Sequence, residues 1–155
     1  MDIPKFFRAM AISVGLQVML FPVCRAQSAA IPLASFGVQQ INLNLPEYQR
    51  LRWDGGWIYI DELSGLTAGV RGLIVYRVNA ETYIAYERAC PYRTADECAR
   101  VEVDASNLFM KDPCCGSSFA FANGEPTGGP ARYPLRIYET SLSGNTLTIS
   151  DTIIR

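Results

Sequence analysis

The chain has 155 residues, a net charge of -1, 49% hydrophobic residues and 19% charged residues, which is typical of one globular domain. A nearly balanced charge without a basic stripe argues against nucleic acid as a partner, because binding to phosphates requires clustered Lys and Arg side chains. The sequence contains no histidine, which excludes Ser-His and Cys-His nucleophile pairs and the imidazole ligands of most catalytic zinc and iron sites.

Residues 1–26 resemble an export signal. Lys5 and Arg8 form a short basic region, and the apolar run that follows is interrupted and shorter than the roughly 20 residues of a transmembrane helix. Two processing routes remain open: residues 20–24 resemble a bacterial lipobox that would make Cys24 the acylated first residue of a lipoprotein, and ordinary cleavage after Ala26 is the alternative. Both routes place the chain on the periplasmic side of a bacterial cell envelope, lipid-anchored or soluble, and leave Cys24 outside the folded domain.

After a small-residue tether at residues 27–36, one domain is expected at residues 37–155. Alternation of apolar and polar residues between turn signals predicts short strands and almost no helix. The predicted strands cover residues 41–45, 57–60, 73–78, 82–87, 101–103, 118–122, 136–140 and 146–150, and one helix of about two turns is predicted at residues 47–53. Turn signals at residues 79–81 and 143–145 predict two hairpins. The fold class is therefore predicted to be all-β.

Four cysteines lie in two loops that each follow a predicted strand. The first loop runs from Cys90-Pro91-Tyr92 to Cys98, and the second has the sequence Lys-Asp-Pro-Cys-Cys-Gly-Ser-Ser-Phe at residues 111–119. This arrangement resembles the Rieske iron-sulfur domain, whose two loops have the forms Cys-Pro-His and Cys-Pro-Cys-His-Gly-Ser-x-Phe. Residues 129–135, Gly-Pro-Ala-Arg-Tyr-Pro-Leu, are similar to the proline loop of that family. The resemblance covers residues 72–149 and implies small antiparallel sheets or a partly open barrel with a two-loop tip.

The same resemblance places the four ligand positions of a Rieske cluster at Cys90, Tyr92, Asp112 and Cys115. In a Rieske centre two cysteines hold one iron and two histidines hold the other, so one of the four ligands is kept, at Cys90. A carboxylate and a phenol are unusual ligands for a cluster built on soft thiolates. We therefore expect no 2Fe-2S cluster and no metal, with an atypical 2Fe-2S cluster as the alternative.

An even number of cysteines in an exported domain predicts two disulfides. Four cysteines allow three pairings, of which the vicinal bond between Cys114 and Cys115 would close a strained ring. In respiratory Rieske domains a disulfide ties the two cluster loops together. The resemblance implies that Cys98 and Cys114 form this bond, which leaves Cys90 and Cys115 as a second pair across the cluster position.

The other candidate residues have simpler structural interpretations. Tyr92 is expected to pack with its hydroxyl hydrogen-bonded, and Asp112 before proline is a common turn starter. Ser117 follows a glycine, as many nucleophilic serines do, but no general base accompanies it. Trp53 and Trp57 flank a turn and are expected to pack rather than to form a binding platform.

These observations favour a non-catalytic exported domain that serves as an accessory or interaction subunit in an envelope protein complex. Two alternatives remain open. An atypical electron-transfer protein would hold iron, as a 2Fe-2S cluster, or another metal such as zinc. A thiol-disulfide redox protein would have a reduction potential well above that of a structural disulfide, although the chain has no Cys-x-x-Cys motif.

Overall fold

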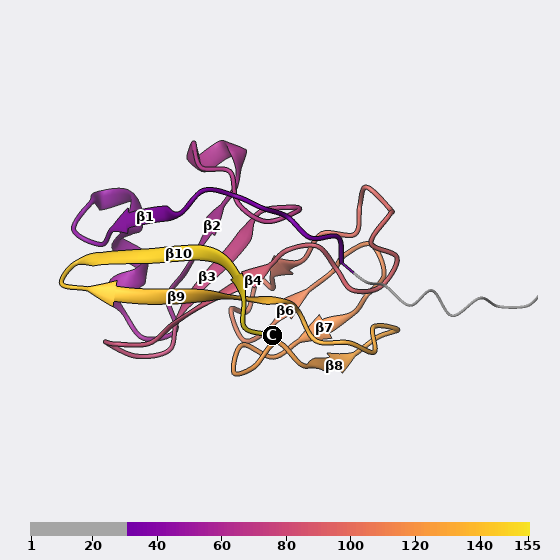
Figure 1. Ribbon diagram of the computed structural model, residues 1–155. Coiled ribbons are helices and arrows are strands. Elements are labelled where there is room, and N and C mark those ends of the chain that lie inside the picture. The colour runs from indigo at the N-terminus through magenta and orange to yellow at the C-terminus, as the bar shows by residue number, and fades with distance from the viewer. Residues whose placement is uncertain (1–30) are drawn as a thin grey trace, which may run out of the picture.

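The computed structural model describes residues 31–155, so the predicted signal at residues 1–26 and Cys24 lie outside the described part of the chain. The described residues form two antiparallel sheets and two short 3-10 helices, which confirms the predicted all-β class. Figure 1 shows the smaller sheet at one end of the molecule and the turn of the C-terminal hairpin at the other. No helix within residues 31–155 is long and apolar enough to cross a membrane.

The larger sheet has six strands in the order β1-β10-β9-β4-β3-β2. These strands are β1 Gln39–Asn42, β2 Trp57–Ile60, β3 Leu73–Arg77, β4 Tyr83–Glu87, β9 Ile137–Ser143 and β10 Thr146–Ile153. The smaller sheet contains, in spatial order, β5 Glu102–Val103, β6 Met110–Lys111, β7 Ser118–Phe119 and β8 Pro126–Gly128. The 3-10 helices η1 Pro46–Arg52 and η2 Glu62–Ser64 precede and follow β2 in the chain.

Most predicted strands are present, and the differences have local causes. Strand β2 has the predicted bounds, whereas β6 and β8 were not predicted because segments of two or three residues are too short to show alternation. Strand β1 begins earlier than predicted and ends at Asn42, whose side-chain oxygen accepts the N–H of Asn44 at 3.0 Å and so starts a turn. The predicted helix at residues 47–53 is the 3-10 helix η1, which begins at Pro46.

Both faces of the β3-β4 hairpin are buried, each in a different hydrophobic core. Neighbouring residues of a strand point to opposite faces, so Leu73 and Val75 contact the core against η1 and β10, whereas Ile74 contacts the core against the smaller sheet. Strand β4 divides in the same way, with Ala85 in the first core and Tyr86 in the second. The second core also contains both ends of the cysteine loops and therefore supports them.

The described part of the predicted tether, residues 31–36, packs on the domain. Phe36 meets the ring of Tyr138 edge to face at 5.1 Å, and the Arg136 guanidinium donates to the carbonyl oxygens of Ile31 and Pro32. These contacts fix residues 31–36 along β9, because an aromatic ring and a partly buried guanidinium both gain partners there. The packed chain thus begins before the predicted boundary at residue 37.

A buried carboxylate joins the end of β4 to three other parts of the chain. Glu87 is fully buried and accepts the N–H groups of Val70, Arg71 and Ala89 at 2.7, 3.0 and 2.9 Å. The Tyr138 hydroxyl donates to the same carboxylate at 3.0 Å. Burial, together with the charge of Glu87, raises the pKa of Tyr138 to about 12. Glu87 therefore fixes the chain where the first cysteine loop begins.

We predict that Glu87→Gln lowers the free energy of unfolding by about 2 kcal/mol or more, because one amide oxygen cannot serve four buried donors. Urea unfolding followed by fluorescence measures the loss. The exposed carboxylate of Glu81 provides the control, and Glu81→Gln is expected to change the stability by less than about 0.5 kcal/mol. Equal unfolding midpoints for the two variants would contradict this role of Glu87.

Candidate functional site

A disulfide joins the two cysteine loops. Cys98 of the first loop is bonded to Cys114 of the second, with the two Cα atoms 5.6 Å apart, as the Rieske resemblance implies. Cys90 lies at the start of the first loop, where its N–H donates to the carbonyl oxygen of Ala99 at 3.1 Å. The hydrogen bond from Cys90 to Ala99 thus closes the base of the first loop, and the disulfide links this loop to the second one.

The second loop is a tight turn built on Asp112. One carboxylate oxygen of Asp112 accepts the N–H of Cys114 at 2.8 Å, and its carbonyl oxygen accepts the N–H of Gly116 at 2.8 Å. Asp112 therefore starts a turn, as its position before proline predicts. The turn also buries the Asp112 side chain completely.

The proline loop, residues 129–135, packs against the second cysteine loop and fixes its position. The N–H of Ala131 donates to the buried Ser117 hydroxyl at 3.0 Å. Gly129 has a φ of +81° and approaches so closely that an added Cβ would lie 2.5 Å from the Cα of Ser117. A glycine is therefore required at this position, and the two loops keep a fixed separation.

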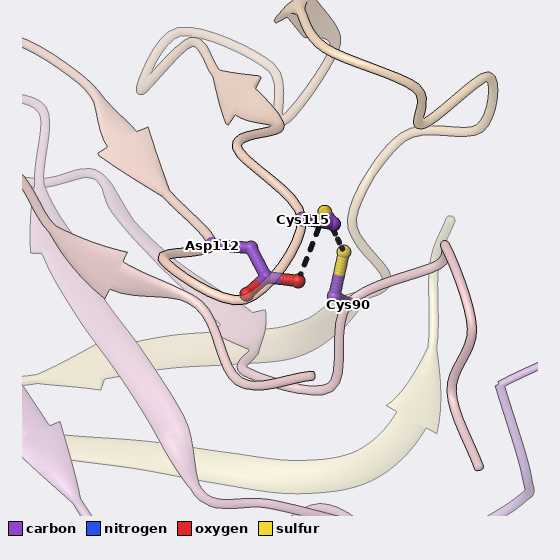
Figure 2. Close-up of side chains that lie close together, drawn as sticks. All are labelled: Cys90, Asp112 and Cys115. Carbon is purple, nitrogen blue, oxygen red and sulfur yellow. Dashed lines mark hydrogen bonds between the residues drawn. The ribbon is translucent and has the colours of Figure 1, made fainter. Parts of the chain in front are cut away.

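Three of the four expected ligand positions converge on one point. Figure 2 shows the side chains of Cys90, Asp112 and Cys115 directed toward one another from the two loops. The two sulfur atoms lie 3.9 Å apart, and Cys115 Sγ lies 3.2 Å from Asp112 Oδ2. All three ligand atoms fall within 4.8 Å of one another. Cys90 and Asp112 are fully buried, and Cys115 is partly buried.

Ser117 surrounds the sulfur of Cys115 with polar groups. Its hydroxyl oxygen lies 3.0 Å from Cys115 Sγ, and its N–H donates to the same sulfur at 3.4 Å. The Cys115 thiol donates to the Ser117 hydroxyl oxygen, which also accepts the N–H of Ala131. Cys115 Sγ is therefore held in place between Ser117 and the carboxylate of Asp112.

Burial raises the pKa of the Cys90 thiol well above its usual range, and a hydrogen bond to the Asp112 carboxylate raises it further. The N–H of Tyr92 opposes this shift by donating to the sulfur. Because the thiolate is the reactive form of cysteine, Cys90 is not an activated nucleophile in this arrangement.

The expected disulfide between Cys90 and Cys115 is absent, and both residues are free thiols. Their sulfurs are 3.9 Å apart, against about 2.05 Å in a disulfide. The physical reason is that Cys115 is held by Ser117 and Asp112 rather than released toward Cys90. Tyr92 is partly buried and packs against the second core, as expected. The expected hydrogen bond of its hydroxyl is not found among the residues that the structure describes.

A group of ion pairs that was not predicted from the sequence connects the two ends of the first cysteine loop. Asp61 accepts from Arg88 and Arg100, each at 2.9 Å through the same carboxylate oxygen. The buried Arg88 guanidinium also lies 3.9 Å from the centre of the Tyr59 ring and donates to the Val101 carbonyl oxygen. This group could not be recognised from the sequence, because Arg88 and Arg100 lie 27 and 39 residues from Asp61 along the chain.

The tryptophan pair lies elsewhere, in a shallow depression beside the start of β2. Trp53 is exposed, whereas Trp57 is partly covered by the Arg50 guanidinium, 4.7 Å from its ring centre. The Trp57 indole N–H donates to the side chain of Asn107 at 2.9 Å. Trp57 therefore packs as expected, whereas the expectation was wrong for Trp53, which is 75% exposed at the C-terminal end of η1. Neither residue joins the cysteine loops.

No protein-family model matches the chain, and no curated protein matches it either. Among solved structures, the chain is similar to one described as a complex of reduced oxygenase and oxidized ferredoxin in carbazole 1,9a-dioxygenase. That match has 18% sequence identity and a TM-score of 0.46, and it covers 66% of this chain and 86% of the other. A likeness at this level establishes neither a family nor a function for this chain.

We predict that replacing both cysteines of the loop disulfide, Cys98→Ser with Cys114→Ser, lowers the free energy of unfolding by about 3 kcal/mol, because the denatured chain gains freedom. Urea unfolding with and without a reductant measures this. Reductant is expected to destabilise the natural chain by a similar amount and to leave the double variant unchanged. A natural chain that is insensitive to reductant would show that the bond contributes nothing.

Proposed function

We propose that the chain is an exported, non-catalytic Rieske-like domain of the cell envelope. Its two-loop tip is fixed by the disulfide between Cys98 and Cys114 and contacts a partner protein as an accessory subunit. The main support is the arrangement at the former ligand positions, where Cys90, Asp112 and Cys115 lie too close together to hold a 2Fe-2S cluster.

The residues present do not fit the cluster that the resemblance implies. In a Rieske centre the ligands are divided between two irons, which would put Cys90 on one iron and Cys115 on the other. Their sulfurs would then lie on opposite sides of a core of two irons and two sulfides. At 3.9 Å they have instead the spacing of two sulfurs on one ion, about 3.8 Å for tetrahedral bonds of about 2.3 Å.

The site also lacks the groups of a hydrolytic or nucleophilic enzyme. The Cys90 thiol is buried with a raised pKa, and the Ser117 hydroxyl is buried between Ala131 and Cys115. The sequence offers no imidazole to activate either group. A binding role is therefore favoured over catalysis.

The tip offers a rigid surface for such binding. Its two cysteine loops are joined by the disulfide, and the proline loop is joined to them by the hydrogen bond from Ala131 to Ser117. Arg132 and Tyr133 are exposed in the proline loop, and Tyr133 shows 55% of its surface to solvent. Arg and Tyr are enriched in protein interfaces, and rigid loops bind without a large loss of conformational entropy.

We predict that protein purified without oxygen contains neither stoichiometric iron nor acid-labile sulfide, because the sulfurs of Cys90 and Cys115 have the spacing of two ligands on one ion rather than on the two irons of a cluster. Metal analysis, sulfide determination and electron paramagnetic resonance of the dithionite-reduced protein measure this. Two irons and two sulfides per chain, with a Rieske-type spectrum, would overturn the cluster-free assignment and restore electron transfer.

We further predict that the full-length chain migrates with a larger complex when detergent extracts of the envelope are separated on native gels. Arg132→Glu with Tyr133→Ala is expected to release it, because the loss of two interface residues worth about 2 kcal/mol weakens binding roughly 30-fold. Migration of the natural chain as a monomer would contradict the accessory role.

The β3-β4 turn supplies the control for this experiment. Glu81 is exposed there, at the opposite end of β4 from the first cysteine loop, and Glu81→Arg is expected to leave the complex intact. In the same cells, Cys24→Ser moves the chain from the membrane to the soluble periplasmic fraction if Cys24 is acylated. Ordinary cleavage after Ala26 would leave both forms in the soluble fraction.

A further inference from the structure

We propose that Cys90, Asp112 and Cys115 bind a single thiophilic divalent ion of the zinc type. This inference deepens the proposed function and rests on the absence of a 2Fe-2S cluster from the same two loops. A single ion would take the place of the cluster beneath the disulfide-linked tip.

The spacing of the three ligand atoms already suits one tetrahedral ion. Two thiolates on such an ion lie about 3.8 Å apart, and a thiolate and a carboxylate oxygen about 3.5 Å apart, for bonds of about 2.3 and 2.0 Å. The corresponding distances here are 3.9 Å between Cys90 Sγ and Cys115 Sγ, and 3.2 Å between Cys115 Sγ and Asp112 Oδ2. Adjustments of a few tenths of an ångström would complete the coordination.

The Asp112 carboxylate lacks a cation. It is fully buried, and none of the salt bridges found within residues 31–155 includes it. Oδ1 accepts the N–H of Cys114, whereas the hydrogen bond found at Oδ2 within residues 31–155 comes from the thiol of Cys115. Buried charges in proteins are normally paired or coordinate a metal. A divalent ion between the two sulfurs and Oδ2 would supply the missing positive charge.

A backbone N–H and a hydroxyl group of Ser117 lie against the Cys115 sulfur in a way that suits a coordinated thiolate. The N–H of Ser117 donates to Cys115 Sγ, and the Ser117 hydroxyl lies 3.0 Å from the same sulfur. A neutral thiol is a weak acceptor, so the N–H of Ser117 has a stronger partner when the sulfur of Cys115 is a thiolate bound to a metal.

The donor set determines the class of ion. Two thiolates and one carboxylate favour zinc and cobalt(II) over magnesium and calcium, which prefer oxygen ligands only. Binding replaces two S–H bonds by two metal–sulfur bonds and releases two protons to solvent, with no change in oxidation state. The partly exposed side of Cys115 leaves the fourth tetrahedral position to water.

The test is titration of the full chain, isolated without oxygen or reductant and freed of metal by a chelator, with cobalt(II) and then zinc. We expect one cobalt per chain, a near-ultraviolet charge-transfer band from thiolate to cobalt, and loss of the band when zinc is added. Zinc is also expected to raise the Tm of the natural chain.

Two variants test the proposed metal ligands, and a third variant serves as the control. Cys115→Ser is expected to weaken zinc binding by about 100-fold or more and to abolish the charge-transfer band from that sulfur. Asp112→Asn keeps the acceptor for the N–H of Cys114 and is expected to weaken zinc binding about 10-fold or more. The control is Asp96→Asn in the neighbouring group of Asp96, Cys98 and Cys114, whose sulfurs are already joined in a disulfide. It is expected to leave binding unchanged.

The outcomes separate this inference from the proposed function. A disulfide between Cys90 and Cys115 in the isolated protein, found by mass spectrometry, would overturn the metal site and leave the cluster-free assignment intact. Free thiols in a protein that shows no cobalt band would also overturn the metal site and leave the cluster-free assignment intact. Equal zinc binding by Cys115→Ser and the natural chain would have the same consequence. Iron and sulfide at two each per chain would overturn both.

Discussion

The interaction on which the rest of the structure depends is the burial of the Glu87 carboxylate at the end of β4. Four donors, from residues 70, 71, 89 and 138, converge on its two oxygens. A buried carboxylate is stable only when its lone pairs are satisfied, so the segment before β3, the start of the first cysteine loop and β9 must all meet at this point. Cys90 is three residues further along the chain, and its position follows from this constraint.

The contrast between Glu87 and Asp112 separates a structural carboxylate from a functional one. Both are fully buried. Glu87 is surrounded by three backbone N–H groups and a phenol, whereas Asp112 Oδ2 faces sulfur atoms and accepts no backbone N–H group. Backbone donors keep their positions whatever else binds, but thiol protons are lost when a metal binds. The carboxylate whose partners can be exchanged is therefore the one at the candidate site.

The sequence predicted the strands of the larger sheet because they are long enough to show alternation, as in β2 and the β3-β4 hairpin. It could not predict β6 or β8, which form only because the smaller sheet packs on the second core. The loop motifs identified Cys90, Asp112 and Cys115 as neighbours, and the resemblance implied the bond between Cys98 and Cys114. The free state of Cys90 and Cys115 was not predictable, because it depends on hydrogen bonds between Cys115 and Ser117, whose position is set by the distant Ala131.

The disulfide holds the two cysteine loops together in a way that does not depend on a cofactor. A cluster holds two loops together by coordinating both, and a covalent bond between Cys98 and Cys114 does the same by reducing the freedom of the unfolded chain. With Gly129 and Ala131 pressed against Ser117 from the other side, the loops are fixed whether or not an ion is bound. The side chains at positions 90, 92, 112 and 115 can then be substituted without loss of the loop structure. The tip keeps a rigid surface on which Tyr133 and Arg132 are exposed. A recognition role at the tip and a single-ion site beneath it are therefore compatible in one fold.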